Sequence, residues 1–292
     1  MRLKNINQQQ LKTLLPTNKL KNTSSVGLSL REPNRDELFK QSIDIDFIEV
    51  LTENYSYNQS SDWESIVELS ETYPILYHGL TMNIGGLDNF DEPHLKNINK
   101  LFKATNPFFI TDHLCMSRHN GKSTFDLLPI PHTKNMIHHL KERYLRLQDV
   151  FGENIAFENI STYFRFKIDE MDEVDFYLEL QDKTDIKFQL DINNLVVNQY
   201  NHGIDIEKLI NNLIPDRIVA YHIAGYSDQG DFYFDAHDTS VPEIVWDYYK
   251  IALKRIGSRP TTIERDENIP STFILMDEAF RAKHIMEEVA SY

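Results

Sequence analysis

Histidines and carboxylates recur in this sequence at the ends of short runs rich in Val, Ile, Phe and Tyr. In chain order, the series is His78, His113, Glu158, Asp191, His222, Asp235, His237 and Glu264. Imidazoles and carboxylates are common ligands of divalent metal ions, and a mixed set of them suits iron, manganese or zinc better than calcium or magnesium. The chemistry that these residue types first indicate is therefore metal binding.

The number of candidate ligands predicts more than one metal ion. Four imidazoles and four carboxylates in one concave site would not remain unpaired, because each desolvated charge costs several kcal/mol. One ion takes about four to six ligands, so these residues predict a cluster of two or three ions. A carboxylate such as Glu158 would bridge two of them. The alternative is a purely polar site that binds no metal ion.

The chain between these residues predicts a regular alternation of strand and helix. The predicted strands are Val26–Leu30, Phe47–Leu51, Ile75–Gly79, Phe108–His113, Asn154–Asn159, Ile186–Asp191, Ile218–Ile223 and Thr261–Arg265. The predicted helices are Trp63–Thr72, Pro93–Ala104, Thr133–Phe151, Asp172–Lys183, Asp205–Leu213 and Pro242–Ile256. Such alternation is typical of parallel β–α–β units. Eight units in roughly 270 residues predict a (β/α)8 TIM barrel of the α/β class, with an open sheet as the alternative.

A barrel would bring the candidate ligands together, because the C-terminal ends of all its strands surround one mouth. Three further polar residues lie near that expected mouth. Glu53 and Asn54 follow the second predicted strand, and His202 lies in the expected loop after the sixth. These residues are predicted either to orient ligands and contact substrate or, as an equal alternative, to belong to a structural network.

Composition places the chain among ordinary globular proteins. Of its 292 residues, 41% are hydrophobic and 26% are charged, and no apolar run approaches the roughly 18 residues of a membrane helix. The net charge of −15 disfavours nucleic acid and anionic membranes as partners. The single cysteine, Cys115, is predicted to be a buried structural thiol. Because it cannot form an internal disulfide, we expect a cytoplasmic protein. We also expect an N-terminal arm over residues 1–24 and one domain over 25–292.

The ordered motifs around these residues resemble the multinuclear non-heme iron-dependent oxidase family, formerly a bacterial domain of unknown function. The motifs are His78-Gly, Asp-His113-Leu, Glu158-Asn, Asp191-x-Asn-Asn, Asn-His202-Gly, His222-x-Ala-Gly, Asp235-x-His237-Asp and Glu264-Arg-Asp. They span about residues 25–280. The resemblance implies a TIM barrel similar to xylose isomerase and endonuclease IV, and a relation to the iron oxidase of methanobactin biosynthesis. It also implies oxidation of residues, often cysteines, in ribosomally made precursor peptides of natural product biosynthesis.

The same resemblance implies a role for each motif. His78 and His113 would hold one iron, with Glu158 bridging to a second that Asp191, His222 and Glu264 complete. Asp235 and His237 would hold a third ion together with Asn194, while the neighbouring Asn193 would support a ligand or contact substrate. The related endonuclease barrels have a histidine at the position of Asn194, and an asparagine there is a neutral, weaker ligand. Among all of these, Glu158, Asp191 and His237 are the residues that we expect to be catalytic.

The function implied by the resemblance is oxidation of a precursor peptide by O2 at two or three iron ions, Fe2+ or Fe3+, often with a small partner protein that presents the peptide. Zinc or manganese is the alternative metal. The rival functions are a metal-dependent hydrolase or phosphodiesterase of the endonuclease IV type, a sugar isomerase, and a peptide-binding or metal-binding module without turnover. The oligomeric state stays open, with a homodimer as one option.

Overall fold

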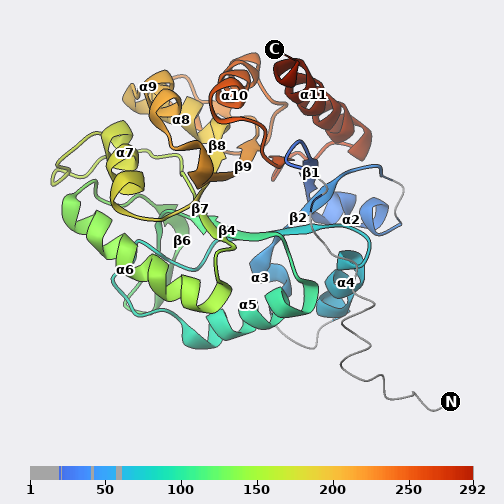
Figure 1. Cartoon of the computed structure of the whole chain (residues 1–292), viewed down its shortest axis with the longest axis horizontal. Coiled ribbons are helices and arrows are strands. Elements are labelled where there is room, and N and C mark those ends of the chain that lie inside the picture. Colours follow the sequence, from blue (N-terminus) through green and yellow to red (C-terminus); the bar gives the residue numbers. More distant parts are fainter. Residues whose placement is uncertain (1–19, 21, 41–42, 57–60, 292) are drawn as a thin grey trace.

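Eight parallel strands close into a barrel in the computed structural model of this chain, which describes residues 20, 22–40, 43–56 and 61–291 (Figure 1). The strands, in their order around the barrel, are β1 (Val26–Ser29), β12 (Thr261–Ile263), β9 (Ile218–Ile223), β8 (Phe188–Asp191), β7 (Ile155–Glu158), β4 (Phe109–His113), β3 (Ile75–Gly79) and β2 (Phe47–Leu51). The predicted closed barrel is confirmed, with strand ends within two residues of prediction, and the open sheet is wrong. Most of the predicted arm over residues 1–24 lies outside the described residues.

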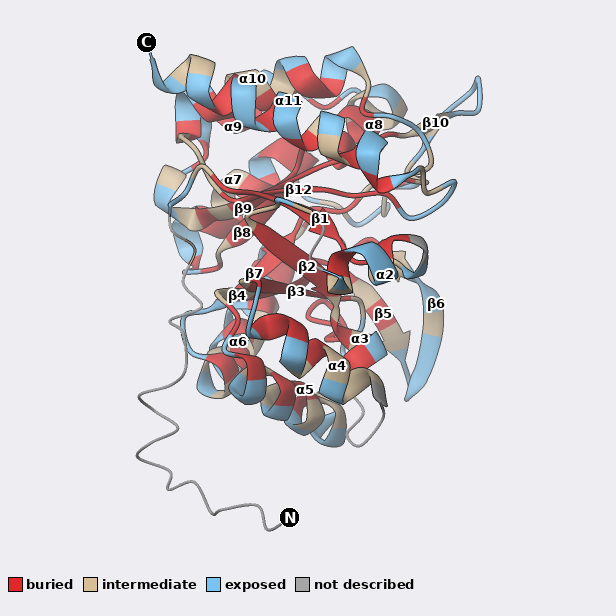
Figure 2. Ribbon diagram, turned by 90° about the vertical axis from the view of Figure 1, so that its right-hand side faces the viewer, coloured by how far each residue is buried: buried red, intermediate tan, exposed pale blue. Residues whose placement is uncertain are grey.

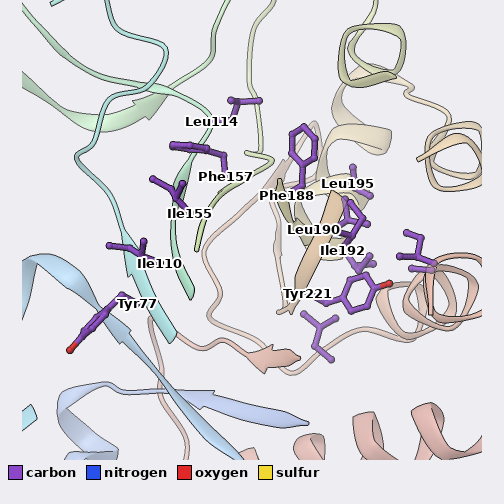
Figure 3. Packing of buried hydrophobic residues seen from close by; sticks show 14 of the residues in the cluster. Tyr77, Ile110, Leu114, Ile155, Phe157, Phe188, Leu190, Ile192, Leu195 and Tyr221 are labelled. Atoms are coloured by element: carbon purple, nitrogen blue, oxygen red, sulfur yellow. The ribbon is translucent and has the colours of Figure 1, made fainter. Parts of the chain in front are cut away.

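The barrel strands are short and buried on both faces, as expected for parallel strands with helices on one side and a filled interior on the other. Side chains alternate between the two faces along each strand. Tyr77, Phe157 and Tyr221 precede His78, Glu158 and His222. Tyr77, Phe157 and Tyr221 belong to the apolar packing between strands and helices (Figure 3). The next residue of each strand therefore points into the barrel.

Helices cover the outside of the barrel (Figure 1). Those at predicted positions are α4 (Ser61–Ser70), α5 (Glu92–Thr105), α6 (Lys134–Phe151), α7 (Glu173–Lys183), α9 (Ile206–Asn212) and α10 (Glu243–Ile256). On α6 a stripe of buried residues, which includes Leu140, Tyr144 and Leu147, faces the strands, and the Tyr144 ring packs edge-on against Phe157 of β7. Thr133 and Asp172 begin α6 and α7 by accepting hydrogen bonds from backbone N–H groups of the first turn.

Several elements were not predicted from the sequence. They are α2 (Glu32–Phe39), α3 (Thr52–Tyr55), α8 (Ile192–His202), α11 (Thr272–Ala290), the 3-10 turn Pro215–Arg217, and two hairpins, β5 (Met116–His119) with β6 (Lys122–Leu128) and β10 (Ser227–Asp228) with β11 (Tyr233–Phe234). Helix α8 starts directly at the end of β8, since the Asp191 carboxylate accepts a hydrogen bond from Asn194 N–H. The predicted loop position of His202 is therefore wrong, because this residue ends α8.

The two hairpins project on the same side of the molecule (Figure 2). Cys115, beside β5, is fully buried, which confirms the predicted buried thiol. Among the described residues, no helix combines the length and the apolar character that crossing a bilayer requires.

A buried carboxylate outside the barrel mouth makes the stability of the fold depend on pH. Glu173 at the start of α7 contacts Arg165 at 3.2 Å and accepts a hydrogen bond from Asn198, yet burial raises its pKa to about 7. The folded state therefore holds a proton on Glu173 that the unfolded state has already released between about pH 4.5 and 7. This contribution makes the folded state less stable as pH rises.

We expect Glu173→Gln to gain stability relative to the wild type by up to about 3 kcal/mol between pH 4.5 and 8. Urea unfolding of both proteins across this range measures the difference in their free energies of unfolding. The prediction concerns how this difference changes with pH, so a constant effect of losing the Arg165 pair does not affect it. Parallel pH curves for the two proteins would contradict the raised pKa.

Candidate metal centre

Five barrel strands and two loops, the loops after β11 and β12, bring the eight predicted ligands to one mouth. The parallel register places His113 of β4 level with Glu158 of β7, and Asp191 of β8 level with His222 of β9. Four groups of residues have ligand atoms within 4.8 Å of one another: His78, His113 and Glu158; Glu158, Asp191 and His222; His78, His222 and Glu264; and Asp191, His237 and Glu264. All members are buried, and shared residues join the groups into one cluster.

The first pair of imidazoles aims at one carboxylate oxygen. Nε2 of His78 and Nε2 of His113 lie 3.2 and 3.9 Å from Oε2 of Glu158, and 3.3 Å from each other. The other nitrogen of each ring is anchored. His113 Nδ1 donates to the Gly79 carbonyl at 2.9 Å. His78 Nδ1 donates to the Thr111 hydroxyl at 2.8 Å, since that hydroxyl uses its own proton toward the Tyr77 carbonyl. Both Nε2 atoms therefore present lone pairs.

His222 sits at the centre of the cluster. Its Nδ1 lies 3.0 Å from Glu264 Oε2, 3.3 Å from Glu158 Oε2 and 3.8 Å from Asp191 Oδ2. Its Nε2 contacts the Glu49 carboxylate of β2 at 2.5 Å. Burial alone lowers the pKa of His222, but the surrounding carboxylates raise that pKa well above its ordinary value.

A third group completes the mouth on the side of β11 and β12. His237 Nε2 lies 2.7 Å from Asp235 Oδ1, while its Nδ1 donates to Asp266 at 3.0 Å. Arg31, which precedes α2, bridges Asp266 and Glu264. Burial raises the pKa of Glu264, but His222 and His237 outweigh it and hold that pKa well below the ordinary range.

The central carboxylates differ in how they bind protons in the metal-free protein. Burial raises the pKa of Asp191 well above its ordinary value, and the neighbouring Glu158 adds to the rise. Burial also opposes ionisation of Glu158, but His222, His78 and His113 lower its pKa to about 2. In the metal-free protein the raised pKa values of Asp191, His222 and His237 favour protons on these groups, and a bound metal ion would displace them.

Several of these buried atoms have no hydrogen-bond partner despite their close neighbours. They are Glu158 Oε2, Asp191 Oδ2, Asn194 Oδ1 and His222 Nδ1. Buried polar atoms are nearly always hydrogen-bonded, so unpaired ones require an explanation. Here lone pairs converge on common points between the side chains and not on donors. That arrangement fits cations with mixed nitrogen and oxygen ligands.

A cavity of about 420 Å³ leads to this cluster. Its inner wall contains His78, His113, Glu158 and Glu264. Its outer wall includes Tyr163, Leu127 of β6 and Phe234 of β11. The two hairpins that the sequence did not predict therefore form part of the entrance to the candidate metal centre.

The structure brings together all eight residues of the predicted series, together with the two asparagines at the start of α8. Asn193 donates to Asp235 at 2.8 Å, and Asn194 Nδ2 donates to the Asn159 carbonyl while its Oδ1 remains unpaired. Their roles as metal ligands, supporting residues and catalytic residues stay predictions.

The other three candidates do not join the cluster. Glu53 on α3 accepts hydrogen bonds from Leu80 N–H and the Thr81 hydroxyl, so it holds the loop after β3. Asn54 is exposed. His202 donates from Nε2 to the Thr162 carbonyl. None of the three lines the cavity.

Sequence reasoning missed Glu49, Arg31 and Asp266. Glu49 could have been found as the lone acidic residue inside an apolar predicted strand, and Asp266 as the final residue of the Glu264-Arg-Asp motif. Nothing in the local sequence marks Arg31, because its partners follow it by more than 230 positions.

Comparison with known proteins identifies the family. The profile described as RiPP precursor modification enzyme MbnB/TglH/ChrH matches residues 25–287. The chain belongs to this family. A UPF0276 protein of Anaeromyxobacter sp. (strain Fw109-5) is 32% identical over 259 residues, which cover 89% of this chain and 92% of the relative. A UPF0276 protein of Acaryochloris marina is 34% identical over 256 residues, which cover 88% and 92% of the two chains. Membership in this family indicates that the chain is an enzyme that modifies RiPP precursors. It also confirms the family resemblance that the sequence motifs indicated.

Solved structures confirm the xylose isomerase-like barrel. A xylose isomerase domain protein from Planctomyces limnophilus superposes with a TM-score of 0.57 at 14% identity, over 91% of this chain and 97% of that chain. D-Psicose 3-epimerase from Clostridium cellulolyticum H10 superposes with a TM-score of 0.55 at 10% identity, over the same shares. At such identities the likeness concerns the fold alone.

The cluster geometry predicts that His113→Ala and Glu158→Ala each lower the metal content by about one ion per chain without unfolding the barrel. His113 lines the cavity, so water can fill the space it leaves, and loss of Glu158 relieves repulsion among buried carboxylates. Elemental analysis and circular dichroism measure the two effects.

His138→Ala is the matched control, since His138 is an exposed residue of α6 away from the mouth. We expect wild-type metal content in this variant. Full occupancy in both His113→Ala and Glu158→Ala would overturn the ligand assignment.

Proposed function

We propose that this chain is a multinuclear iron-dependent oxidase that uses O2 to modify residues, by preference cysteines, of a ribosomally made precursor peptide. The family supplies the class of substrate. The observation that carries the metal-dependent part is the convergence of unpaired imidazole and carboxylate lone pairs at the mouth.

Charge supports more than one cation. Six carboxylates lie at the mouth or directly beneath it: Glu49, Glu158, Asp191, Asp235, Glu264 and Asp266. Arg31 is the one arginine or lysine paired with them among the described residues. With neutral histidines, the ionised site would carry five excess negative charges, and burying these unpaired would be prohibitive. Two or three divalent or trivalent ions would neutralise them.

We assign one ion to His78, His113 and Glu158, a second to Glu158, Asp191, His222 and Glu264, and a third to Asp235, His237 and Asn194. When bound, iron ions would supply the one-electron chemistry with O2 that the amino acids themselves lack. The protein would hold the ligands in place. Arg31 and Asp266 orient Glu264 and His237, and the Asp266 carboxylate keeps the proton of His237 on Nδ1.

The entrance supports a peptide as substrate. Aromatic side chains stand exposed on both hairpins or beside them, with exposures of 95% for Phe125 and 45% for both Phe234 and Tyr163. Exposed apolar side chains around a polar pocket are typical of sites that bind peptides or proteins. A small peptide-presenting partner protein and a cytoplasmic location belong to this proposal, and the buried thiol of Cys115 is compatible with a reducing compartment.

The first test is metal analysis of protein expressed with abundant iron and purified without oxygen, combined with Mössbauer spectroscopy. We expect two or three iron ions per chain, at least two of them magnetically coupled through a shared carboxylate such as Glu158. Zinc or manganese retained in spite of abundant iron would favour a hydrolase, and protein without metal would contradict the proposal.

The second test is turnover. Co-expression with a precursor peptide encoded beside the gene is expected to change the mass of the peptide in the presence of O2, and Glu158→Ala is expected to abolish that change. His138→Ala serves again as the active control. A mass change that persists without oxygen would contradict an oxidase.

A further inference from the structure

Glu49 lies beside the candidate metal centre, inside the barrel, and does not line its cavity. Its side chain is 1% exposed. One carboxylate oxygen, Oε2, lies 2.5 Å from His222 Nε2 and accepts hydrogen bonds from the Thr262 hydroxyl at 2.9 Å and from Gln189 Nε2 at 3.2 Å. These donors come from β9, β12 and β8. A single carboxylate oxygen on β2 is therefore hydrogen-bonded to side chains of three other strands across the barrel interior.

Hydrogen-bond chemistry sets the orientation of His222. A carboxylate accepts, so the proton between the two groups lies on Nε2 of His222 in the neutral ring. Nδ1 then carries the lone pair, and this is the atom that faces Glu158, Asp191 and Glu264. If the ring were flipped, the metal-facing position would hold a carbon and the Glu49 contact would be lost.

Glu49 differs from the anchors of the other imidazoles. The Gly79 carbonyl and the Thr111 hydroxyl that anchor His113 and His78 are neutral. Asp266, which anchors His237, is charged, but it is 40% exposed and paired with Arg31. Glu49 is the fully buried charged anchor, and among the described residues its one ion pair is with His222.

A purely structural role does not account for this charge. A buried carboxylate without an arginine or lysine partner costs several kcal/mol, and a glutamine of the same shape would still accept from His222 and Thr262. The second oxygen, Oε1, is buried and has no partner. In the metal-free protein the charge of Glu49 pairs with His222. When that imidazole binds a cation, the carboxylate makes the ring a stronger electron donor.

We propose that Glu49 is a positioning residue of the metal centre, which fixes the tautomer and ring orientation of His222 and strengthens Nδ1 of His222 as a ligand. This inference rests on the proposed function only in that the cluster must bind metal. It concerns a residue of β2 that does not itself touch the ions.

The experiment separates the hydrogen bond of Glu49 from its charge. Glu49→Gln keeps an acceptor for His222 Nε2 and loses the charge, whereas Glu49→Leu loses both. Metal-free wild type and both variants are titrated with Co2+, whose visible spectrum reports ligand geometry, and then with Zn2+ in competition with a chelator. We expect roughly 10-fold weaker binding for Glu49→Gln and up to about 100-fold for Glu49→Leu at the His222 ion. We also expect an altered cobalt spectrum only in Glu49→Leu.

Glu173→Gln is the matched control, because it replaces another buried carboxylate by an amide outside the cluster. Its metal affinity is expected to equal that of the wild type. Nitrogen NMR of the zinc-loaded protein adds a second measurement, namely which nitrogen of His222 carries the proton. A merely structural role of Glu49 would not affect this result. A proton on Nε2 of His222 is expected in the wild type and in Glu49→Gln. If Glu49→Leu does not fold, these two proteins still decide the question.

The outcomes distinguish this inference from the proposed function. A wild type that binds neither Co2+ nor Zn2+ would overturn the metal centre itself. A wild type that binds, with unchanged affinity in Glu49→Gln or a proton on Nδ1 of His222, would overturn the role of Glu49 and leave the metal centre intact.

Discussion

The concentration of negative charge inside one barrel mouth is the constraint on which the rest of this structure depends. Carboxylates that face one another repel strongly where the surroundings are of low dielectric constant, and a single arginine, Arg31, cannot compensate for the six that gather here. In the metal-free protein, protons shared with His222 and His237 reduce this repulsion. The barrel must therefore be stable enough to hold these groups close together, and its two-sided burial of short strands by apolar residues gives it that capacity.

The imidazoles show how the scaffold turns this constraint into a binding site. Each ring is fixed by a hydrogen bond from the nitrogen that faces away from the cluster, to a carbonyl, a hydroxyl or a carboxylate. In each neutral ring, the remaining nitrogen carries a lone pair that points toward the cluster. Such an array is costly without cations and favourable with them. Metal binding would therefore account for the unpaired atoms, the shifted pKa values and the mixture of imidazoles and carboxylates.

The same barrel serves other chemistry in its structural neighbours, which include a sugar epimerase. Function therefore depends on the residues at the strand ends and on the loops around them. In this chain the hairpins β5–β6 and β10–β11 line part of the entrance and carry exposed aromatic side chains. Helix α8, which begins directly after Asp191, places Asn193 and Asn194 at the same mouth.

The sequence by itself determined the barrel and most of the residues that meet in the cluster, because both follow from local patterns. Alternating apolar runs and amphipathic segments set the eight strands, and a polar residue at the end of an inward-pointing strand must lie at the mouth. Only the tertiary structure decided which polar residues join the cluster. Glu49 and Arg31 meet His222 and Glu264 across more than 170 positions of sequence. By contrast, Glu53 accepts hydrogen bonds from the Leu80 N–H and the Thr81 hydroxyl, and His202 donates to the Thr162 carbonyl. Distances between distant strands are fixed by barrel closure and side-chain packing, and no local pattern encodes them.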